Sequence, residues 1–218
     1  MLDVKSLLMR ALSSLCRETA SVTIRIGGPG AVGKSTFSVE LLDSLRRDGI
    51  EVSVLEVDCY LRDRLERAAL QPQISGYNPA AYRLDQAEQD LDQLLAGEAI
   101  FTRGYDKVAG TRGEPILVRP APVTIVEGSM ALQPCFFRPS STSLFLSSTL
   151  DILFENRRRR EVDMGFSSED IVEKYCKLLP DFHQYIVPQT QFADFVVEVG
   201  HAYKFSSVKG RDDRPAIC

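Results

Sequence analysis

The chain of 218 residues contains no tryptophan and only two histidines, and its five cysteines never stand in a CxxC spacing. Such a composition does not favour a zinc centre, whose ligands usually come in closely spaced pairs. His183 and His201 are therefore expected to be surface or packing residues. Dispersed cysteines are typical of reduced thiols, which indicates a cytoplasmic protein. These cysteines are Cys16, Cys59, Cys135, Cys176 and Cys218.

Long apolar runs are also missing, and none is long enough to cross a bilayer. Asp3, Lys5 and Arg10 interrupt the N-terminal apolar stretch, so we expect no signal peptide there. Its apolar residues repeat at helical spacing, which predicts an amphipathic helix over residues 1–18 packed on the domain. Contact of this helix with a membrane surface is the less favoured alternative.

The balance of charge is slightly negative, with a net charge of −4, and 44% of the residues are hydrophobic. A nucleic-acid partner usually requires a basic surface, so we do not expect one. The length and the hydrophobic fraction suit one ordinary domain over residues 1–218 with ample core. The sequence allows a homo-oligomer but does not fix the oligomeric state.

The most informative segment is GGPGAVGKST, from Gly27 to Thr36. Positions 28–35 match the pattern GxxxxGK followed by Ser or Thr, which a chain of this length matches by chance on the order of once in a hundred. A β-branched run, Val22 to Ile26, precedes the loop, and an apolar helical stripe follows it to Arg47. This is the strand–loop–helix context that a phosphate-binding loop requires.

The chemistry of the loop explains its residue types. Glycines let backbone N–H groups approach phosphate oxygens, and the helix N-terminus adds partial positive charge. Lys34 is expected to reach the β- and γ-phosphates of a nucleoside triphosphate, and the Ser35 hydroxyl to bind Mg²⁺. The predicted nucleotide-binding residues are Gly28, Gly30, Ala31, Val32, Gly33, Lys34, Ser35 and Thr36.

The rest of the chain alternates between apolar runs and helical patterns, which predicts an α/β fold: a parallel sheet with helices on both faces. The expected strands are 22–26, 51–57, 123–126, 144–146 and 195–199, the last being the final strand. The expected helices are 36–47, 84–95, one through the arginine run 157–160, and 168–179 capped by Ser167 or Ser168. Residues 61–82 are predicted to be irregular or partly helical, with Pro72, Gly76 and Pro79 as breakers.

A small β-ribbon is expected over about residues 98–120, from extended runs at 100–105 and 116–119 separated by a Gly-rich turn. Three of the predicted sheet strands end in chemically useful residues: the phosphate loop, Asp58 and Glu127. Ligands of parallel sheets gather at the carboxyl ends of the strands, so these groups are expected to meet at one edge.

With these features placed, the chain resembles the uridine kinase and phosphoribulokinase family of P-loop kinases over roughly residues 20–200. The motifs that carry the resemblance, besides the loop, keep the family's order and spacing. They are VDCY (57–60), NPAAY (78–82), GYDKVAGTR (104–112), VTIVEG (123–128), FENRRRRE (154–161) and VPQTQFAD (187–194).

The resemblance implies transfer of the γ-phosphoryl group of ATP to a hydroxyl of a small metabolite, with Mg²⁺. It makes Asp58 the base that receives the hydroxyl proton, and adds Asp58 and Glu127 to Ser35 at the metal. Arg157 and Arg160, on one helical face of a lid at about 155–170, would offset charge on the transferred group together with Lys34. Arg158 and Arg159 would face solvent or form salt bridges.

The same resemblance implies that the acceptor binds to Tyr60, Tyr77, Asn78, Tyr82, Tyr105 and Arg112. The acceptor side departs from the family pattern, however. Tyr77-Asn78-Pro79 replaces Asp-His-Pro, Gly110-Thr111-Arg112 replaces His-Ser-Arg, and Asp163-Met164-Gly165-Phe166 replaces the lid's Glu-Arg-Gly-Arg. The phosphate side is kept and the acceptor side is changed.

Three hypotheses follow for the function. The first is a uridine kinase-like enzyme with uridine or cytidine as acceptor. The second is a kinase for a sugar, a hydroxy acid or a pantothenate-like acceptor. The third, motivated by the altered lid at Met164 and Phe166, is a nucleotide-binding regulator with little turnover.

Overall fold

The computed structural model describes residues 3–70 and 74–211. The first two residues of the predicted N-terminal helix, the breaker Pro72 and the thiol of Cys218 lie outside the described residues. The four other cysteines, which lie within them, are free thiols.

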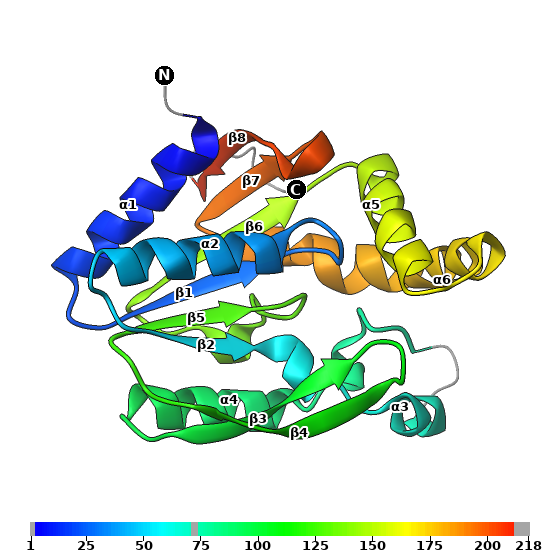
Figure 1. Ribbon diagram of the computed structural model, residues 1–218, viewed down its shortest axis with the longest axis horizontal. Coiled ribbons are helices and arrows are strands. Elements are labelled where there is room, and N and C mark those ends of the chain that lie inside the picture. Colours follow the sequence, from blue (N-terminus) through cyan, green and yellow to red (C-terminus); the bar gives the residue numbers. More distant parts are fainter. Residues whose placement is uncertain (1–2, 71–73, 212–218) are drawn as a thin grey trace.

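The central sheet has six strands in the order β2-β5-β1-β6-β7-β8 (Figure 1). The first five run parallel, as the alternating sequence pattern predicts, and β8 pairs antiparallel with β7 at the edge. The strands are β1 (Val22–Gly27), β2 (Val52–Glu56), β5 (Val123–Glu127), β6 (Ser141–Ser147), β7 (Phe195–Val199) and β8 (Phe205–Gly210).

The prediction that 195–199 is the final strand is wrong, because β8 follows it. In β8 only Phe205 is buried, and serines, a lysine and a glycine fill most of the remaining positions. A strand at a sheet edge needs no continuous apolar face, so its sequence carries little of the periodicity that identifies buried strands.

Helices cover both faces of the sheet. Leu12 of α1 and Leu41 of α2 pack with Ile24 of β1 in one core, and Leu91 of α4 packs with Val126 of β5 in the other. The helices are α1 (Val4–Glu18), α2 (Lys34–Arg47), α3 (Arg64–Leu70), α4 (Leu84–Leu95), α5 (Leu150–Asp163) and α6 (Ser168–Asp181). None of the helices within 3–70 and 74–211 has the length and the hydropathy needed to span a membrane.

A separate two-stranded ribbon joins α4 to the sheet. It consists of β3 (Ile100–Asp106) and β4 (Thr111–Val118), so its second strand begins five residues earlier than the sequence pattern indicates. The Asp106 carboxylate accepts hydrogen bonds from the N–H groups of Val108 and Ala109 and thereby closes a tight turn. This turn carries Lys107 toward the sheet edge.

The elements that surround the site lie beyond the carboxyl ends of β1, β2 and β5, where Figure 1 shows α3, the ribbon turn and the α5–α6 pair. Side-chain caps fix where the latter two helices begin: Thr149 caps α5, and Ser167, one of the two predicted caps, caps α6. The α6 helix runs past its predicted end at Leu179 to Asp181. The segment between α5 and α6 coincides with the middle of the predicted lid.

Candidate active site

The phosphate loop connects β1 to α2 and requires glycine where its backbone turns. Gly28 has a φ of +136° and Gly33 a φ of +99°, both in the region that disfavours side chains. A Cβ on Gly28 would lie 2.3 Å from the carbonyl oxygen of Leu146. The loop thus presses against β6 and leaves the N-terminus of α2 open to the cavity.

Lys34, the first residue of α2, is buried, and its Nζ donates a hydrogen bond to the carbonyl of Pro29 at 2.9 Å. The ammonium group is therefore held across the loop. Burial lowers the pKa of Lys34, while the charges of Glu127 and Asp58 act in the opposite direction. A cation kept under a loop of open N–H groups is suited to phosphate oxygens.

Ser35 and Glu127 come together from different elements. The Ser35 hydroxyl donates a hydrogen bond to Glu127 Oε1 at 3.2 Å. Glu127 ends β5 and is buried, and this burial raises its pKa to about 7, although the charge of Lys34 opposes the shift. A buried carboxylate next to a hydroxyl is a pair of oxygen ligands of the kind that Mg²⁺ prefers.

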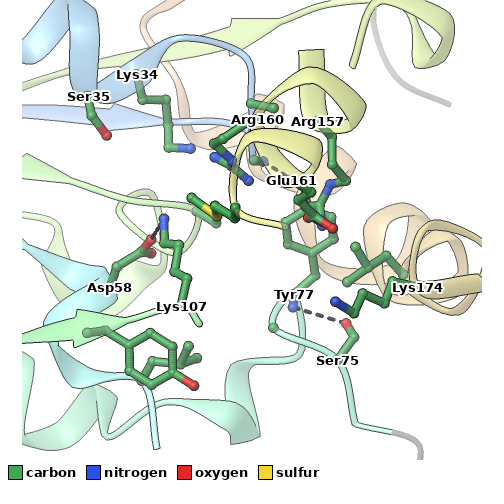
Figure 2. Close-up of a pocket in the computed structure, with 18 of the residues that line it drawn as sticks. Lys34, Ser35, Asp58, Ser75, Tyr77, Lys107, Arg157, Arg160, Glu161 and Lys174 are labelled. Atoms are coloured by element: carbon green, nitrogen blue, oxygen red, sulfur yellow. Dashed lines mark hydrogen bonds and ion pairs between the residues drawn. The ribbon is translucent and has the colours of Figure 1, made fainter. Parts of the chain in front are cut away.

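Asp58 lies in the helical turn Val57–Tyr60 directly after β2. Its carboxylate forms an ion pair with Lys107 Nζ at 3.3 Å, so the ribbon turn reaches the end of the neighbouring sheet strand (Figure 2). Its side chain is one-third exposed toward the cavity. Asp58 is therefore accessible to a ligand, as a base must be.

The arginine run of α5 divides between two faces. Arg157 pairs with Glu161 at 3.1 Å and also donates to the Tyr77 hydroxyl at 3.4 Å, and both Arg157 and Arg160 line the cavity. Arg159 instead pairs with Glu155 on the exposed side. This division matches the helical spacing, while the roles assigned to Arg157 and Arg160 stay predictions.

All these groups line one cavity of about 650 Å³. We call the wall formed by Gly30, residues 33–36, Glu127 and Arg160 the loop end. We call a second part of the lining the hairpin end; it comprises Asp58, Arg64, Arg67, residues 74–77, Tyr82, Tyr105, Lys107, Lys174 and Lys177.

Three of the six predicted acceptor residues line the hairpin end: Tyr77, Tyr82 and Tyr105. The Tyr77 hydroxyl accepts a hydrogen bond from the N–H of Gly30 at 2.7 Å, so it also contacts the phosphate loop. The Tyr82 hydroxyl donates to the carbonyl of Gly76. Tyr77 therefore joins the hairpin end to the loop end.

The other three predicted acceptor residues are not among those that line the cavity. Tyr60 is buried and donates its hydroxyl hydrogen to Asp90 Oδ2 at 2.6 Å. Asn78 caps a short helical turn by accepting from the N–H of Ala80, and Arg112 lies 3.9 Å from Asp63. The structure therefore does not place Tyr60, Asn78 and Arg112 in the lining of the cavity, and their binding role stays a prediction.

Sequence reasoning also missed several residues that line the cavity. Arg64 and Arg67 share a face of α3 at i, i+3 spacing, and Lys107 stands two residues after the predicted Tyr105. Lys174 reaches in from α6, and the Tyr203 ring lies over Gly33. The i, i+3 spacing was a weak signal for Arg64 and Arg67, because residues 61–82 were predicted to be only partly helical, and Tyr203 precedes the missed strand β8.

Two observations test whether these residues fit a nucleotide with a metal ion. Arg160 Nε is buried and has no hydrogen-bond partner among the described residues, although it belongs to a side chain that lines the cavity. A phosphate oxygen is a suitable acceptor for such a donor. The Ser35–Glu127 pair supplies oxygen ligands, but residues 3–70 and 74–211 contain no cluster of three His, Cys, Asp or Glu side chains that would hold a metal alone. The residues therefore fit a Mg²⁺ ion that is shared with phosphate oxygens.

Comparison with known proteins agrees with this geometry. A uridine kinase from Shewanella sp. (strain ANA-3) is 32% identical over 186 residues, which cover 82% of this chain and 88% of the relative. The D-glycerate 3-kinase from Cryptococcus neoformans var. grubii superposes with a TM-score of 0.69 at 13% identity, over 93% of this chain and 99% of that one. The phosphoribulokinase from Rhodobacter spheroides gives 0.64 at 16% identity, over 82% of this chain and 70% of that one.

At such identities the solved structures establish the P-loop kinase fold and no more. The family model described as phosphoribulokinase / uridine kinase matches residues 23–206, which run from the second residue of β1 to the second residue of β8 and include all the site residues described above. On this match and on the relative at 32% identity, the chain belongs to the phosphoribulokinase and uridine kinase family.

Proposed function

We propose that the protein is an ATP-dependent kinase that transfers the γ-phosphoryl group to a hydroxyl of a small molecule. The observation that carries the proposal is the meeting, in one cavity, of a phosphate loop with Lys34, a carboxylate–hydroxyl pair, and the accessible carboxylate of Asp58. Phosphoryl transfer depends mainly on positioning and charge stabilisation, and these groups supply both.

The loop end would hold the triphosphate. The N–H groups at the start of α2 and the Lys34 ammonium would bind phosphate oxygens, and Arg160 would donate from the opposite side through its unpartnered Nε. Their positive charge would offset the negative charge that builds on the transferred group. Arg157, held by Glu161 and Tyr77, would fix the position of this part of α5 over the loop.

Asp58 would receive the proton of the acceptor hydroxyl. As that proton moves to the Asp58 carboxylate, the hydroxyl oxygen bonds to the γ-phosphorus and the bond from phosphorus to the β–γ bridging oxygen breaks, which releases ADP. The Asp58 carboxylate is accessible from the cavity, as a general base must be. Lys107 orients the carboxylate through their ion pair.

Ser35 and Glu127, with Asp58 as the third predicted ligand, would hold Mg²⁺, which when bound neutralises phosphate charge. Because the Glu127 carboxyl has a pKa of about 7, its proton has to leave before it binds a cation. Binding of the metal at this position should therefore weaken in mild acid.

The acceptor is proposed only as a small alcohol. The relative that is 32% identical supports a uridine kinase-like acceptor. Against it, Tyr77 stands where the resemblance expects a carboxylate that grips the ribose hydroxyl pair, and the Tyr77 hydroxyl is already engaged by Gly30 and Arg157. This observation favours the second candidate, a kinase for a non-nucleoside hydroxyl.

The direct test is release of ADP from ATP in the presence of nucleosides, sugars and hydroxy acids. We expect at least one acceptor to raise ADP release well above the rate with ATP alone, and the phosphorylated product to appear in equal amount. ADP release that no acceptor raises, together with tight nucleotide binding, would instead support a regulator with little turnover.

A further inference from the structure

The hairpin end of the cavity carries an excess of positive charge. Five cationic side chains line it, against the one carboxylate of Asp58; of the other carboxylates in the cavity lining, Glu127 lies at the loop end and Glu161 pairs with Arg157. The whole chain, by contrast, has a net charge of −4. The five cations are Arg64, Arg67, Lys107, Lys174 and Lys177.

Carboxylates of the described residues neutralise two of these cations. Lys107 pairs with Asp58 at 3.3 Å, and Lys177 pairs with Glu173 at 2.6 Å. The Arg64 guanidinium donates to the carbonyls of Lys107 and Val108, so it fixes the ribbon turn against α3. Arg67 and Lys174 are the remaining two.

Arg67 is held in place but not neutralised. Its Nη1 donates to the carbonyl of Arg62 at 2.5 Å and to the Tyr105 hydroxyl at 2.9 Å, and its guanidinium lies 5.5 Å from the centre of the Tyr105 ring. Neither Arg67 nor Lys174 forms an ion pair with a carboxylate of the described residues. The Lys174 ammonium lies 3.3 Å from the centre of the Phe166 ring, and Figure 2 shows it beside Ser75 and Tyr77, on the other side of the cavity from Asp58.

The helix that carries Arg67 lies away from the groups that would bind the triphosphate. Figure 1 shows α3 beside the ribbon, separated from the phosphate loop by the ends of β2 and β5. The loop has its own cations, Lys34 and Arg160. An oriented guanidinium without a carboxylate partner is suited to bind a carboxylate or a phosphate through two N–H groups, whereas a neutral nucleoside or sugar offers it no charge.

We propose that the acceptor of this kinase is an anionic alcohol, whose carboxylate or phosphate monoester binds Arg67 and Lys174 while its hydroxyl faces Asp58. The inference rests on the proposed phosphoryl transfer and names the class of its acceptor. It also accounts for the changed sequence at Tyr77, because a carboxylate at that position would repel an anionic acceptor.

The test compares acceptors in pairs that differ in charge: D-glycerate with glycerol, and ribose 5-phosphate with ribose, with uridine as a further neutral compound. We expect kcat/KM for an anionic member to exceed that for its neutral partner by roughly 10- to 100-fold, the range of charge-assisted hydrogen bonds. The two pairs distinguish a carboxylate from a phosphate. Neutral compounds that react as well as anionic ones, or uridine as the best acceptor, would overturn the inference and leave the kinase standing.

Variants then locate the anion site. Arg67→Gln should lower kcat/KM for the anionic acceptor by roughly 10- to 100-fold and change that for its neutral partner less than about twofold. Arg67→Lys should recover part of the loss, and Arg159→Gln, on the exposed face of α5, should have no effect. Equal losses for both members of a pair would show that Arg67 only supports the fold, and would overturn the assignment.

Calorimetric binding of the same anionic compounds, with ADP present, separates this inference from the function on which it rests. Binding that Arg67→Gln removes, without any ADP release, would refute the kinase but support the anion site. Binding by none of the anionic compounds would overturn the site itself.

Discussion

The two ends of the cavity present different chemical groups to a ligand. At the loop end, backbone N–H groups, two glycines with positive φ and one buried lysine form the binding surface. At the hairpin end, long cationic and aromatic side chains from α3, the ribbon and α6 form it. A backbone surface depends on a continuous motif, whereas a side-chain surface changes residue by residue, which fits a fixed phosphate donor and a variable acceptor.

The largest effect should come from the residue at which the two ends meet. Asp58→Asn should lower turnover by roughly 10²–10⁴, the usual contribution of a general base, while the affinity for ATP changes little. ADP release and calorimetry measure the two quantities. Asp43→Asn, on the exposed side of α2, is the matched control, and near-normal turnover of the Asp58 variant would remove it from its role.

Lys34→Ala should disable the loop end alone. We expect turnover to fall by roughly 10²–10³, because a preorganised contact to the transferred group is lost, and ATP to bind more weakly. Acceptor binding, measured by calorimetry with no nucleotide present, should be unchanged. Loss of acceptor binding in this variant would contradict the separation of the two ends. Lys209→Ala, on the edge strand β8, provides the control for removing a surface charge.

The two faces of α5 offer a comparison within one helix. Arg160→Gln should lower turnover by roughly 10- to 100-fold, since a hydrogen bond to a charged group contributes about 1.5–3 kcal/mol. Arg158→Gln, on the exposed face, should leave it unchanged. Similar rates for the two variants would refute a role for α5 in binding the phosphates.

The pH dependence of metal binding tests Glu127. Its pKa of about 7 means that the ionised fraction, and with it the affinity for Mg²⁺ in the presence of ADP, should fall by about tenfold between pH 8 and pH 6. Binding of Mg²⁺ by the Glu127 carboxylate is expected above the pKa of Glu127 and is lost as the pH falls through that pKa. Glu127→Gln should bind Mg²⁺ weakly, and its remaining pH dependence reports the nucleotide alone. If wild type and variant depend on pH in the same way, Glu127 is not a metal ligand.

The smallest effect is expected for a residue that only supports the wall. Tyr60→Phe removes the hydrogen bond to Asp90 and should lower the free energy of unfolding by about 1 kcal/mol. Denaturant unfolding measures this change. The kcat/KM for the acceptor should stay within about twofold of the wild type, and a selective loss of acceptor affinity would return Tyr60 to the binding site.

The two ends of the cavity also differ in how many of their residues the sequence could predict. The phosphate loop is contiguous, so its pattern and the flanking strand and helix could be recognised directly from residues 22–47. Asp58 and Glu127 could be placed because the ends of parallel strands share an edge. Tyr60 could not be placed in this way. The turn after β2 directs the Asp58 side chain to the cavity and the Tyr60 side chain to Asp90, and the sequence does not show this difference.

The cations of the hairpin end show the limit most clearly. Arg67 and Lys174 are more than 100 positions apart and lie on two helices whose polar residues read as ordinary solvated faces. The edge strand β8 was missed for a related reason. It is held by its pairing with β7, so it does not need the apolar pattern by which a buried strand is recognised in a sequence.

The sequence by itself determined the α/β class, the phosphate loop and the chemistry available at the strand ends, because each depends on local spacing that the chain carries in order. Only the tertiary structure decided which side chains of the ribbon, α3 and α6 face the cavity and which of them are neutralised there. Those properties arise from the docking of distant elements, and local spacing does not record it.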